Sequence, residues 1–339
     1  MDSMRKPIKL LLISVAFLFS TACERTIAPR EGGGSGGDNA NAPNASRGSR
    51  PPANNAEAAN AYGAPRTLGR LQDAEIAESS GVCASRQAPD LFWTHNDSGG
   101  GALLYAFNSR GERRGVWRVS GATARDWEGI ASARGTEDEN GRSLLYIGDI
   151  GDNNRARSEI VVYSIFEPQV TQADAASTKL RPRPTEPATV FRLRYPDGKH
   201  DAEALMVHPQ TGDLYIITKN TSDAAGVYKL PAPFTSGRVS TLARVGSVRL
   251  PSLLGGMVTG GDISPDGRRV VLCDYFALYE MVLPGGADQS FDSIWQNPLT
   301  PINAGERNQG EAVCYSADGK AIITTSEGVA APLYEVRRE

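Results

Sequence analysis

From residue 66 onward, apolar positions occur in short alternating or β-branched runs, and Gly, Asp, Asn and Pro separate one run from the next. Runs of this length and period are typical of β-strands joined by turns. Helical periodicity is hard to find in the same region. The pattern therefore predicts an all-β fold.

One short block recurs along this region, and in four of its five copies an acidic residue precedes a small or apolar strand start. The copies are Ser80-Gly81-Val82, Glu128-Gly129-Ile130, Glu203-Ala204-Leu205, Asp262-Ile263 and Glu311-Ala312-Val313. Self-similarity of this kind is the signature of a repeat architecture. We interpret each copy as the first strand of a four-stranded blade, which makes the domain a single β-propeller of five blades.

The strands expected in the individual blades follow the apolar runs. They are residues 81–85, 90–94, 103–108 and 115–119 in the first blade; 129–133, 144–148, 160–166 and 188–195 in the second; 204–207, 214–218 and 227–230 with a further strand in the third; and 262–264, 269–273, 277–282 and 292–296 in the fourth.

The fifth blade is one strand short, because only the runs that begin at residues 311, 321 and 333 are available before the chain ends. A spare strand-like segment, residues 66–72, precedes the first blade. Donating this N-terminal strand to the last blade closes the ring and removes exposed sheet edges. Six blades remain an alternative if the long stretch 158–203 contains another one.

Two segments precede the predicted domain, which spans residues 65–339. Residues 1–22 join basic positions to an apolar run, 10–19, that is too short to span a bilayer, and they end in small residues before Cys23. This order predicts a lipoprotein signal peptide with Cys23 as the lipidation site; an ordinary secretory signal is the alternative. Residues 23–64, rich in Gly, Asn, Pro and Ala, predict a disordered tether. We therefore expect a lipid-anchored, extracytoplasmic protein on a bacterial membrane, in the periplasm or at the cell surface.

Charge and cysteine content narrow the possible partners. The formal net charge of -3 gives no reason to expect nucleic acid, and we expect a monomer. Cys83, Cys273 and Cys314 lack metal-type spacing. Cys83 and Cys314 occupy equivalent places in neighbouring blades, so a disulfide is one possibility and buried thiols are the other.

Polar residues gather where a propeller places the starts of first strands and the ends of second strands, which share one face of the central channel. Beside the recurring block itself, this channel face is predicted to carry Asp97, Asp126, Asp149, Asp152, Asn153, His200, Asp201, Lys219, Asp274 and Glu327.

So many carboxylates around one axis repel one another and raise each other's pKa. A hard divalent cation would compensate them, and Ca²⁺ takes six to eight oxygen ligands in flexible geometry. Zinc is less suited to a chain with so few histidines, although His95 and His200 belong to this face. The alternatives are that the acids accept hydrogen bonds from strand-start amides and hydroxyls with water in the channel, or that they are catalytic.

Several segments resemble a group of secreted bacterial propeller proteins that is largely uncharacterised. They are Trp93-Thr-His-Asn-Asp-Ser-Gly, Asp126-Trp-Glu-Gly-Ile, Tyr146-Ile-Gly-Asp-Ile-Gly-Asp-Asn, His200-Asp-Ala-Glu-Ala-Leu, Thr259-Gly-Gly-Asp-Ile-Ser-Pro-Asp-Gly and Gln309-Gly-Glu-Ala-Val. The placement of one Glu or Ser per blade is also similar to the calcium-activated nucleotidases (apyrases), five-bladed propellers with Ca²⁺ in the channel. That resemblance implies a metal-binding inner ring of Ser80, Glu128, Glu203, Asp262 and Glu311.

These observations favour a membrane-tethered module that binds a ligand or an envelope protein and holds a structural Ca²⁺ in its acidic channel. The alternative is a metal-assisted hydrolase of phosphoester, ester or glycan substrates on the same face, because the loop 149–157 mixes acids with Arg155 and Arg157 that can clamp an anion. Protein binding at the rim is a third reading, because fold does not set function.

Overall fold

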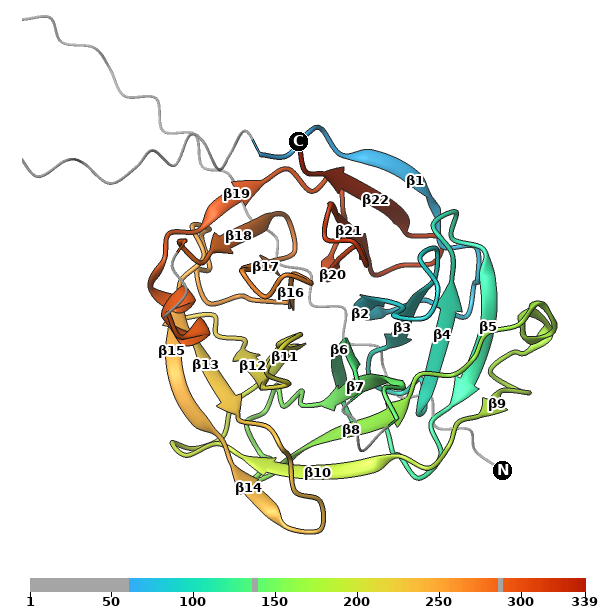
Figure 1. The fold of residues 1–339 in the computed structure, drawn as a ribbon, viewed down its shortest axis with the longest axis horizontal. Helices are drawn as coiled ribbons and strands as arrows, with labels where there is room; N and C mark the ends of the chain where they lie inside the picture. The colour runs from blue at the N-terminus through green and yellow to red at the C-terminus, as the bar shows by residue number, and fades with distance from the viewer. Residues whose placement is uncertain (1–60, 136–139, 286–288) are drawn as a thin grey trace, which may run out of the picture. The chain divides into compact units, whose positions relative to one another are not determined.

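The computed structural model describes residues 61–135, 140–285 and 289–339. Within them, five sheets, each with four antiparallel strands, surround a common axis as the blades of a β-propeller (Figure 1). The prediction of an all-β, five-bladed propeller is confirmed.

Each blade contains four antiparallel strands that run outward from the axis in the order given. Blade 1 has β2 (Ser79–Ala84), β3 (Phe92–Asn96), β4 (Leu103–Phe107) and β5 (Arg113–Arg118); blade 2 has β6 (Trp127–Arg134), β7 (Ser143–Asp149), β8 (Ile160–Phe166) and β10 (Thr189–Arg194); blade 3 has β11 (Ala202–Val207), β12 (Leu214–Thr218), β13 (Ala225–Leu230) and β15 (Ala243–Val248); blade 4 has β16 (Gly260–Ile263), β17 (Arg269–Cys273), β18 (Leu278–Val282) and β19 (Thr300–Ile302); blade 5 has β20 (Gly310–Tyr315), β21 (Ala321–Ser326), β22 (Pro332–Arg337) and β1 (Arg66–Arg70).

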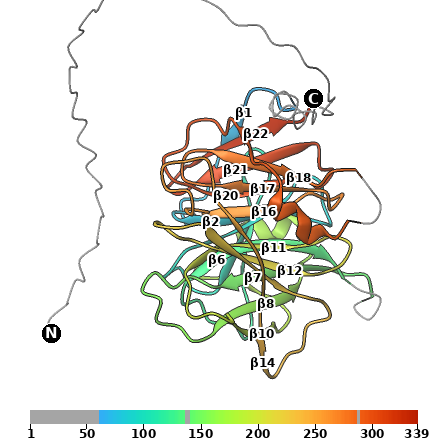
Figure 2. The ribbon, with the colours of Figure 1, turned by 90° about the vertical axis from the view of Figure 1, so that its left-hand side faces the viewer.

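The ring is closed by the N-terminal strand, as the spare segment 66–72 predicts. β1 pairs antiparallel with β22, with Arg66 opposite Glu335 and Arg70 opposite Pro332. The chain just before β1 extends this pairing through a bridge between Tyr62 and Arg338. Seen from the side, blade 5 with this closing strand and blade 2 lie at opposite edges of the ring (Figure 2).

Two expectations about strands are wrong. Residues 158–203 do not contain a sixth blade; they hold β8, the 3₁₀-helix η2 (Gln172–Ala176), the short strand β9 (Arg183–Pro184) and β10. Residues 292–296 belong to a second 3₁₀-helix, η3 (Phe291–Gln296), and β19 is the outer strand of blade 4. The apolar residues Phe291, Ile294 and Trp295 stand at positions i, i+3 and i+4, which is helical spacing.

The connections between third and fourth strands act as straps onto the preceding blade. β9, between the third and fourth strands of blade 2, pairs in parallel with β5 of blade 1. The short strand β14 (Val239–Thr241), from the same connection in blade 3, pairs in parallel with β10 of blade 2. In blade 4 the corresponding segment is η3, which packs on β15 of blade 3. Each strap therefore joins two blades at the rim.

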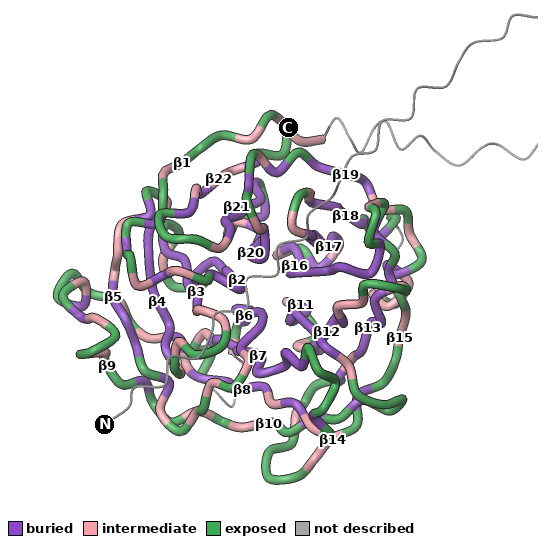
Figure 3. Tube along the Cα trace, turned by 180° about the vertical axis from the view of Figure 1, so that it is seen from behind, coloured by how far each residue is buried: buried purple, intermediate pink, exposed green. Residues whose placement is uncertain are grey.

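The hydrophobic core lies between adjacent blades rather than in one central cluster. Trp93 and Trp127, both inaccessible to solvent, belong to the cluster between blades 1 and 2. The first strands around the axis are almost entirely buried, whereas exposed residues concentrate in the loops and at the rim (Figure 3). Cys83, Cys273 and Cys314 are buried free thiols, so the disulfide alternative is wrong.

The expected signal peptide, Cys23 and nearly all of the expected tether lie outside the described residues. Among the residues that the structure describes, no helix has the length and apolar character needed to cross a membrane.

Candidate cation site at the channel mouth

An irregularity at the start of the first strand aims polar side chains into the channel. The pairing register of first and second strands shifts at this point in blades 1, 2, 3 and 5. Such a bulge leaves an extra residue unpaired and redirects its side chain. The bulged segments carry Ser80, Glu128, Glu203 and Glu311, so four of the five predicted ring residues occupy matching positions.

The fifth predicted ring residue, Asp262, lies elsewhere. β16 pairs with β17 without a register shift, and Asp262 stands opposite Val271, inside the ladder. Its carboxylate accepts hydrogen bonds from the backbone amides of Tyr315 (2.9 Å) and Ile263 (2.8 Å). Blade 4 has no bulge, so Asp262 does not stand at the bulged position that Ser80, Glu128, Glu203 and Glu311 share. The resemblance to the apyrases places all five residues at equivalent positions.

The bulge in blade 2 requires glycine after the acidic residue. Gly129 has φ of +79°, and a Cβ at this position would lie 2.8 Å from the backbone nitrogen of Leu205 in the next blade. Only glycine adopts this conformation and allows such an approach without strain. The Glu-Gly pair therefore fixes both the direction of the Glu128 side chain and the contact between blades 2 and 3.

Neutral donors link two of the ring carboxylates. The Ser80 hydroxyl donates to Glu128 and lies 3.3 Å from Glu311 Oε2. The Gln309 amide donates to the other oxygen of Glu311 at 3.0 Å. Neither donor carries a positive charge, so neither compensates the charge of these two buried carboxyl groups when they are ionised.

Glu203 has a different environment because a lysine reaches it. Lys219 Nζ forms an ion pair with Glu203 Oε1 and donates to the Tyr275 hydroxyl at 3.0 Å. The second carboxylate oxygen, Glu203 Oε2, is buried and has no hydrogen-bond partner among the described residues. We call Glu203, Lys219 and Tyr275, from blades 3 and 4, the lysine half of the mouth.

Three carboxylates converge on the opposite side. Asp97 follows β3, Asp126 precedes β6, and Glu128 lies in β6; one oxygen from each lies within 4.8 Å of the other two. Asp126 and Asp97 are half-buried and Glu128 is buried. Together with Glu311 and Glu327 from blade 5, these residues form what we call the acid half of the mouth.

Burial and mutual repulsion raise the pKa values of these carboxyl groups. Burial, followed by the neighbouring Asp97, raises the pKa of Asp126 to about 7. Burial and then Glu311 raise the pKa of Glu327 to about 9. The pKa of Glu128 is raised well above its usual range, first by burial and then by Glu203. A bound cation would relieve these shifts by stabilising the charged forms.

In the lysine half the forces on the carboxyl group are mixed. Burial raises the pKa of Glu203, Lys219 opposes that rise, and Glu311 adds to it, so that the pKa is raised to about 8. The positive charge of Lys219 is thus the difference between this half and the acid half, where none of the described basic side chains forms an ion pair with the five carboxylates.

In the loop 149–157, which the hydrolase alternative uses as an anion clamp, Arg157 is occupied by contacts within the loop, whereas Arg155 is exposed. Arg157 forms a buried ion pair with Asp149 at 2.7 Å and donates to the Gly151 carbonyl at 2.9 Å. Asp152 accepts from the backbone amides of Ala156 and Arg157. Asp201 accepts from the amide of Asp152 at 2.7 Å, which fastens the loop to blade 3, while Asn153 is exposed.

The remaining predicted residues of the channel face also have structural contacts. Asp274 accepts hydrogen bonds from the amides of Phe276 and Ala277 and from the Tyr279 hydroxyl, so it caps the turn after β17. His200 lies 3.0 Å from Asp197 and 3.1 Å from the Tyr228 hydroxyl. Asp197 and His200 lie just before β11, the first strand of blade 3, and Tyr228 lies in β13 of the same blade.

The roles of Tyr275 and Gln309 were not predicted. Both residues are adjacent in sequence to positions on the predicted face, Asp274 and the Gly310-Glu311 start of β20. The sequence repeat therefore suffices to place both residues on the channel face. Their hydrogen bonds to Lys219 and Glu311 depend on side-chain direction, which the repeat does not give.

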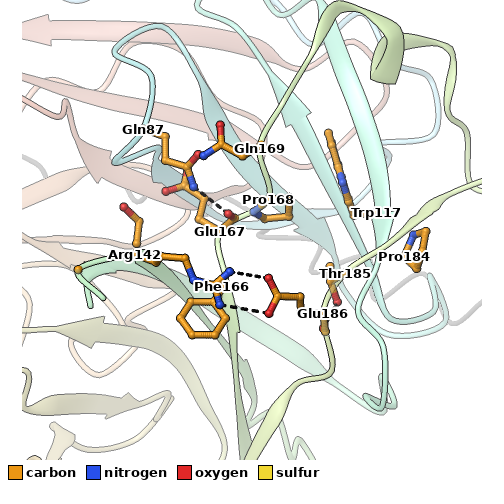
Figure 4. A pocket seen from close by; sticks show the side chains of 12 residues that line it. Gln87, Trp117, Arg142, Phe166, Glu167, Pro168, Gln169, Pro184, Thr185 and Glu186 are labelled. Atoms are coloured by element: carbon orange, nitrogen blue, oxygen red, sulfur yellow. Dashed lines mark hydrogen bonds and ion pairs between the residues drawn. The ribbon is translucent and has the colours of Figure 1, made fainter. Parts of the chain in front are cut away.

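A separate cavity of about 440 Å³ lies at the rim between blades 1 and 2, under the strap that contains β9. Arg142 makes two hydrogen bonds to Glu186, at 2.6 and 3.1 Å, and its guanidinium lies 3.3 Å from the centroid of the Phe166 ring (Figure 4). Gln87 donates to the Glu167 carbonyl at 2.7 Å. Arg142 and Glu186 thus form an ion pair in this wall, whereas Glu167 accepts hydrogen bonds from the Trp93 indole and the Arg86 backbone amide.

No protein-family model matches the chain, and no curated protein matches it. The domain is an all-β, five-bladed propeller, and the carboxylate oxygens of Asp97, Asp126 and Glu128 lie close enough together to hold a metal ion.

Proposed function

We propose that this protein is a lipid-anchored envelope lipoprotein whose propeller is a binding module with Ca²⁺ in the acid half of the channel mouth. The observation that carries the proposal is the convergence of Asp97, Asp126 and Glu128, with oxygens within 4.8 Å of one another. The cluster has no ion pair to a described basic side chain, and a bound cation would stabilise the ionised form that burial and mutual repulsion disfavour.

The donor set favours Ca²⁺ over the other common divalent cations. All three side chains offer carboxylate oxygens, which hard cations prefer. Mg²⁺ demands near-octahedral geometry at short distances, whereas Ca²⁺ accepts varied geometry and completes its shell with water. Zinc prefers nitrogen and sulfur ligands, and none of these three residues supplies them.

Calcium binding is tested by metal analysis of the purified full-length protein and by thermal melting with and without a chelator. A ligand that binds only the folded state at 100 times its Kd stabilises it by about 2.7 kcal/mol. We expect Ca²⁺ to raise the Tm, and the double variant Asp126→Asn, Glu128→Gln to lose this response. Glu186→Gln at the rim is the matched control and should keep it. An unchanged Tm in wild type would overturn the Ca²⁺ assignment.

The anchor is tested independently of the metal. Replacing Cys23 with serine removes the proposed acylation site, so the protein should move from the membrane pellet to the soluble fraction. Equal membrane fractions for wild type and Cys23→Ser would refute lipidation at this residue.

A further inference from the structure

Most of the exposed large apolar side chains of the described residues lie in loops on the face of the propeller that carries the acid half. Six large hydrophobic residues are exposed in the described chain, and four of them lie in loops of this face: Leu253, Leu254, Phe276 and Val329. Leu253 is 99% exposed, Phe276 75% and Val329 61%. Apolar side chains gathered on one face mark an interaction surface.

These loops flank the channel by topology. Leu253 and Leu254 lie between β15 and β16, Phe276 lies between β17 and β18, and Val329 lies between β21 and β22. Each connection leads into a first strand or leaves a second strand, so all of them lie on the face that carries the carboxylates. A hydrogen bond from Asn220 to the Gly256 carbonyl, at 2.8 Å, fixes the Leu253 loop to blade 3.

The lysine half shows how this channel accommodates a basic side chain. The ammonium group of Lys219 meets Glu203 and the Tyr275 hydroxyl while the side chain stays mostly buried. None of the acid-half carboxylates forms an ion pair with a described basic side chain, although the charge of Arg157 lowers the pKa of Asp126. Glu203 Oε2 is buried without a hydrogen-bond partner among the described residues, and the charge of Glu203 acts on Glu128.

We propose that the mouth docks a segment of a partner protein in which one Lys or Arg is flanked by apolar side chains. The basic head group enters the acid half and pairs with its carboxylates, and the apolar side chains cover Phe276, Leu253 and Leu254. The partner's cation takes the place that Lys219 takes in the other half. This proposal deepens the binding function above and uses the same carboxylates, so Ca²⁺ and the basic segment compete for them.

Charge complementarity selects a polypeptide over a membrane surface. An anionic bilayer presents negative charge to an acidic face and is repelled, whereas a basic side chain is attracted to it. The exposed apolar side chains alone would suit either a polypeptide or a membrane surface. The negative charge of the carboxylates favours the polypeptide.

The test uses the full-length protein in mild detergent and chelator, with two fluorescent peptides that differ in one residue: an Arg or a Glu between Leu and Trp. We expect the Arg peptide to bind and the Glu peptide to fail. Phe276→Ser and Leu253→Ser should each weaken binding about fivefold, which corresponds to about 1 kcal/mol. Leu180→Ser, at a rim position that is 84% exposed, is the matched control and should not change it.

Three results would overturn the proposal: equal affinities for the two peptides, no effect of the Phe276 and Leu253 variants, or binding to anionic vesicles without binding to the Arg peptide. Added Ca²⁺ should lower the affinity for the Arg peptide. Peptide binding without any Ca²⁺ response of the Tm would refute only the calcium site. A Ca²⁺ response without peptide binding would refute only the docking site.

Discussion

The two halves of the channel mouth contain the same kind of side chain in different electrostatic states. In the lysine half, Glu203 has an ion pair with Lys219, which also bonds to Tyr275. In the acid half, the buried carboxylates of Glu128 and Glu311 receive only neutral donors. Glu203 therefore has a basic partner within the chain, whereas none of the acid-half carboxylates forms an ion pair with a described basic side chain.

The largest expected effect comes from converting the lysine half into a second acid half. Lys219→Met removes the cation but keeps most of the side-chain volume, which leaves Glu203 buried without its partner. Removing one member of a buried ion pair costs about 3 to 5 kcal/mol. Urea unfolding at neutral pH should show this loss, and Lys219→Arg should retain most of the stability. A loss below about 1 kcal/mol for Lys219→Met would mean that the pair is not what separates the halves.

An intermediate effect on stability is expected from the protonation of Glu327, which makes the acid half less negative. The pKa of Glu327 in the folded state is raised to about 9 from 4.5, so the folded state binds this proton more tightly than the unfolded state. The associated stability is fully present below about pH 4.5 and is lost as the pH rises through 9. Metal-free wild type should therefore become less stable between pH 5 and 9.

Glu327→Gln should remove part of this pH dependence, on the order of 1 kcal/mol after allowing for the partial exposure of Glu327. Denaturant unfolding at several pH values in chelator measures the difference. Glu186→Gln at the rim provides the matched control. Parallel stability curves for wild type and Glu327→Gln would show that Glu327 does not titrate in this range.

The smallest effect on stability is expected from removing one hydrogen bond of the lysine half. Tyr275→Phe removes the hydroxyl that accepts a hydrogen bond from Lys219, while the ion pair with Glu203 remains. We expect a loss below about 1 kcal/mol, because one partly buried hydrogen bond is exchanged for a bond to water. Unfolding of this variant alone and combined with Lys219→Met separates the two contacts, since the effect of the tyrosine should vanish once the lysine is absent.

The fold was largely predictable because its determinants are local and repeated. The alternating runs locate most strands, and the missing strand of the last blade matches the spare segment before the first, so closure follows from counting. The error at η3 arises because residues 292–296 are interpreted as a strand, although the apolar residues Phe291, Ile294 and Trp295 have helical spacing.

The site was less predictable because it depends on register and on side-chain pairing. The recurring block places Glu128, Glu203 and Glu311 correctly, but the absence of a bulge in blade 4, which moves Asp262, is not visible in the sequence. The charges of loop 149–157 suggest a ligand clamp, yet Arg157 turns back onto Asp149. Only the folded structure determines which charges form ion pairs within the chain and which do not.

The closure of the ring also determines how the domain responds to force. Where the described chain begins, Ala61 accepts a hydrogen bond from the amide of Glu339, and the Tyr62 hydroxyl donates to Glu280 of blade 4 at 2.6 Å. A pull on the preceding chain is thus shared by the seam between blades 4 and 5 before it reaches β1. The contacts of Tyr62 would therefore break before those of β1. Once they are broken, the pairing of β1 with β22 alone keeps the ring closed.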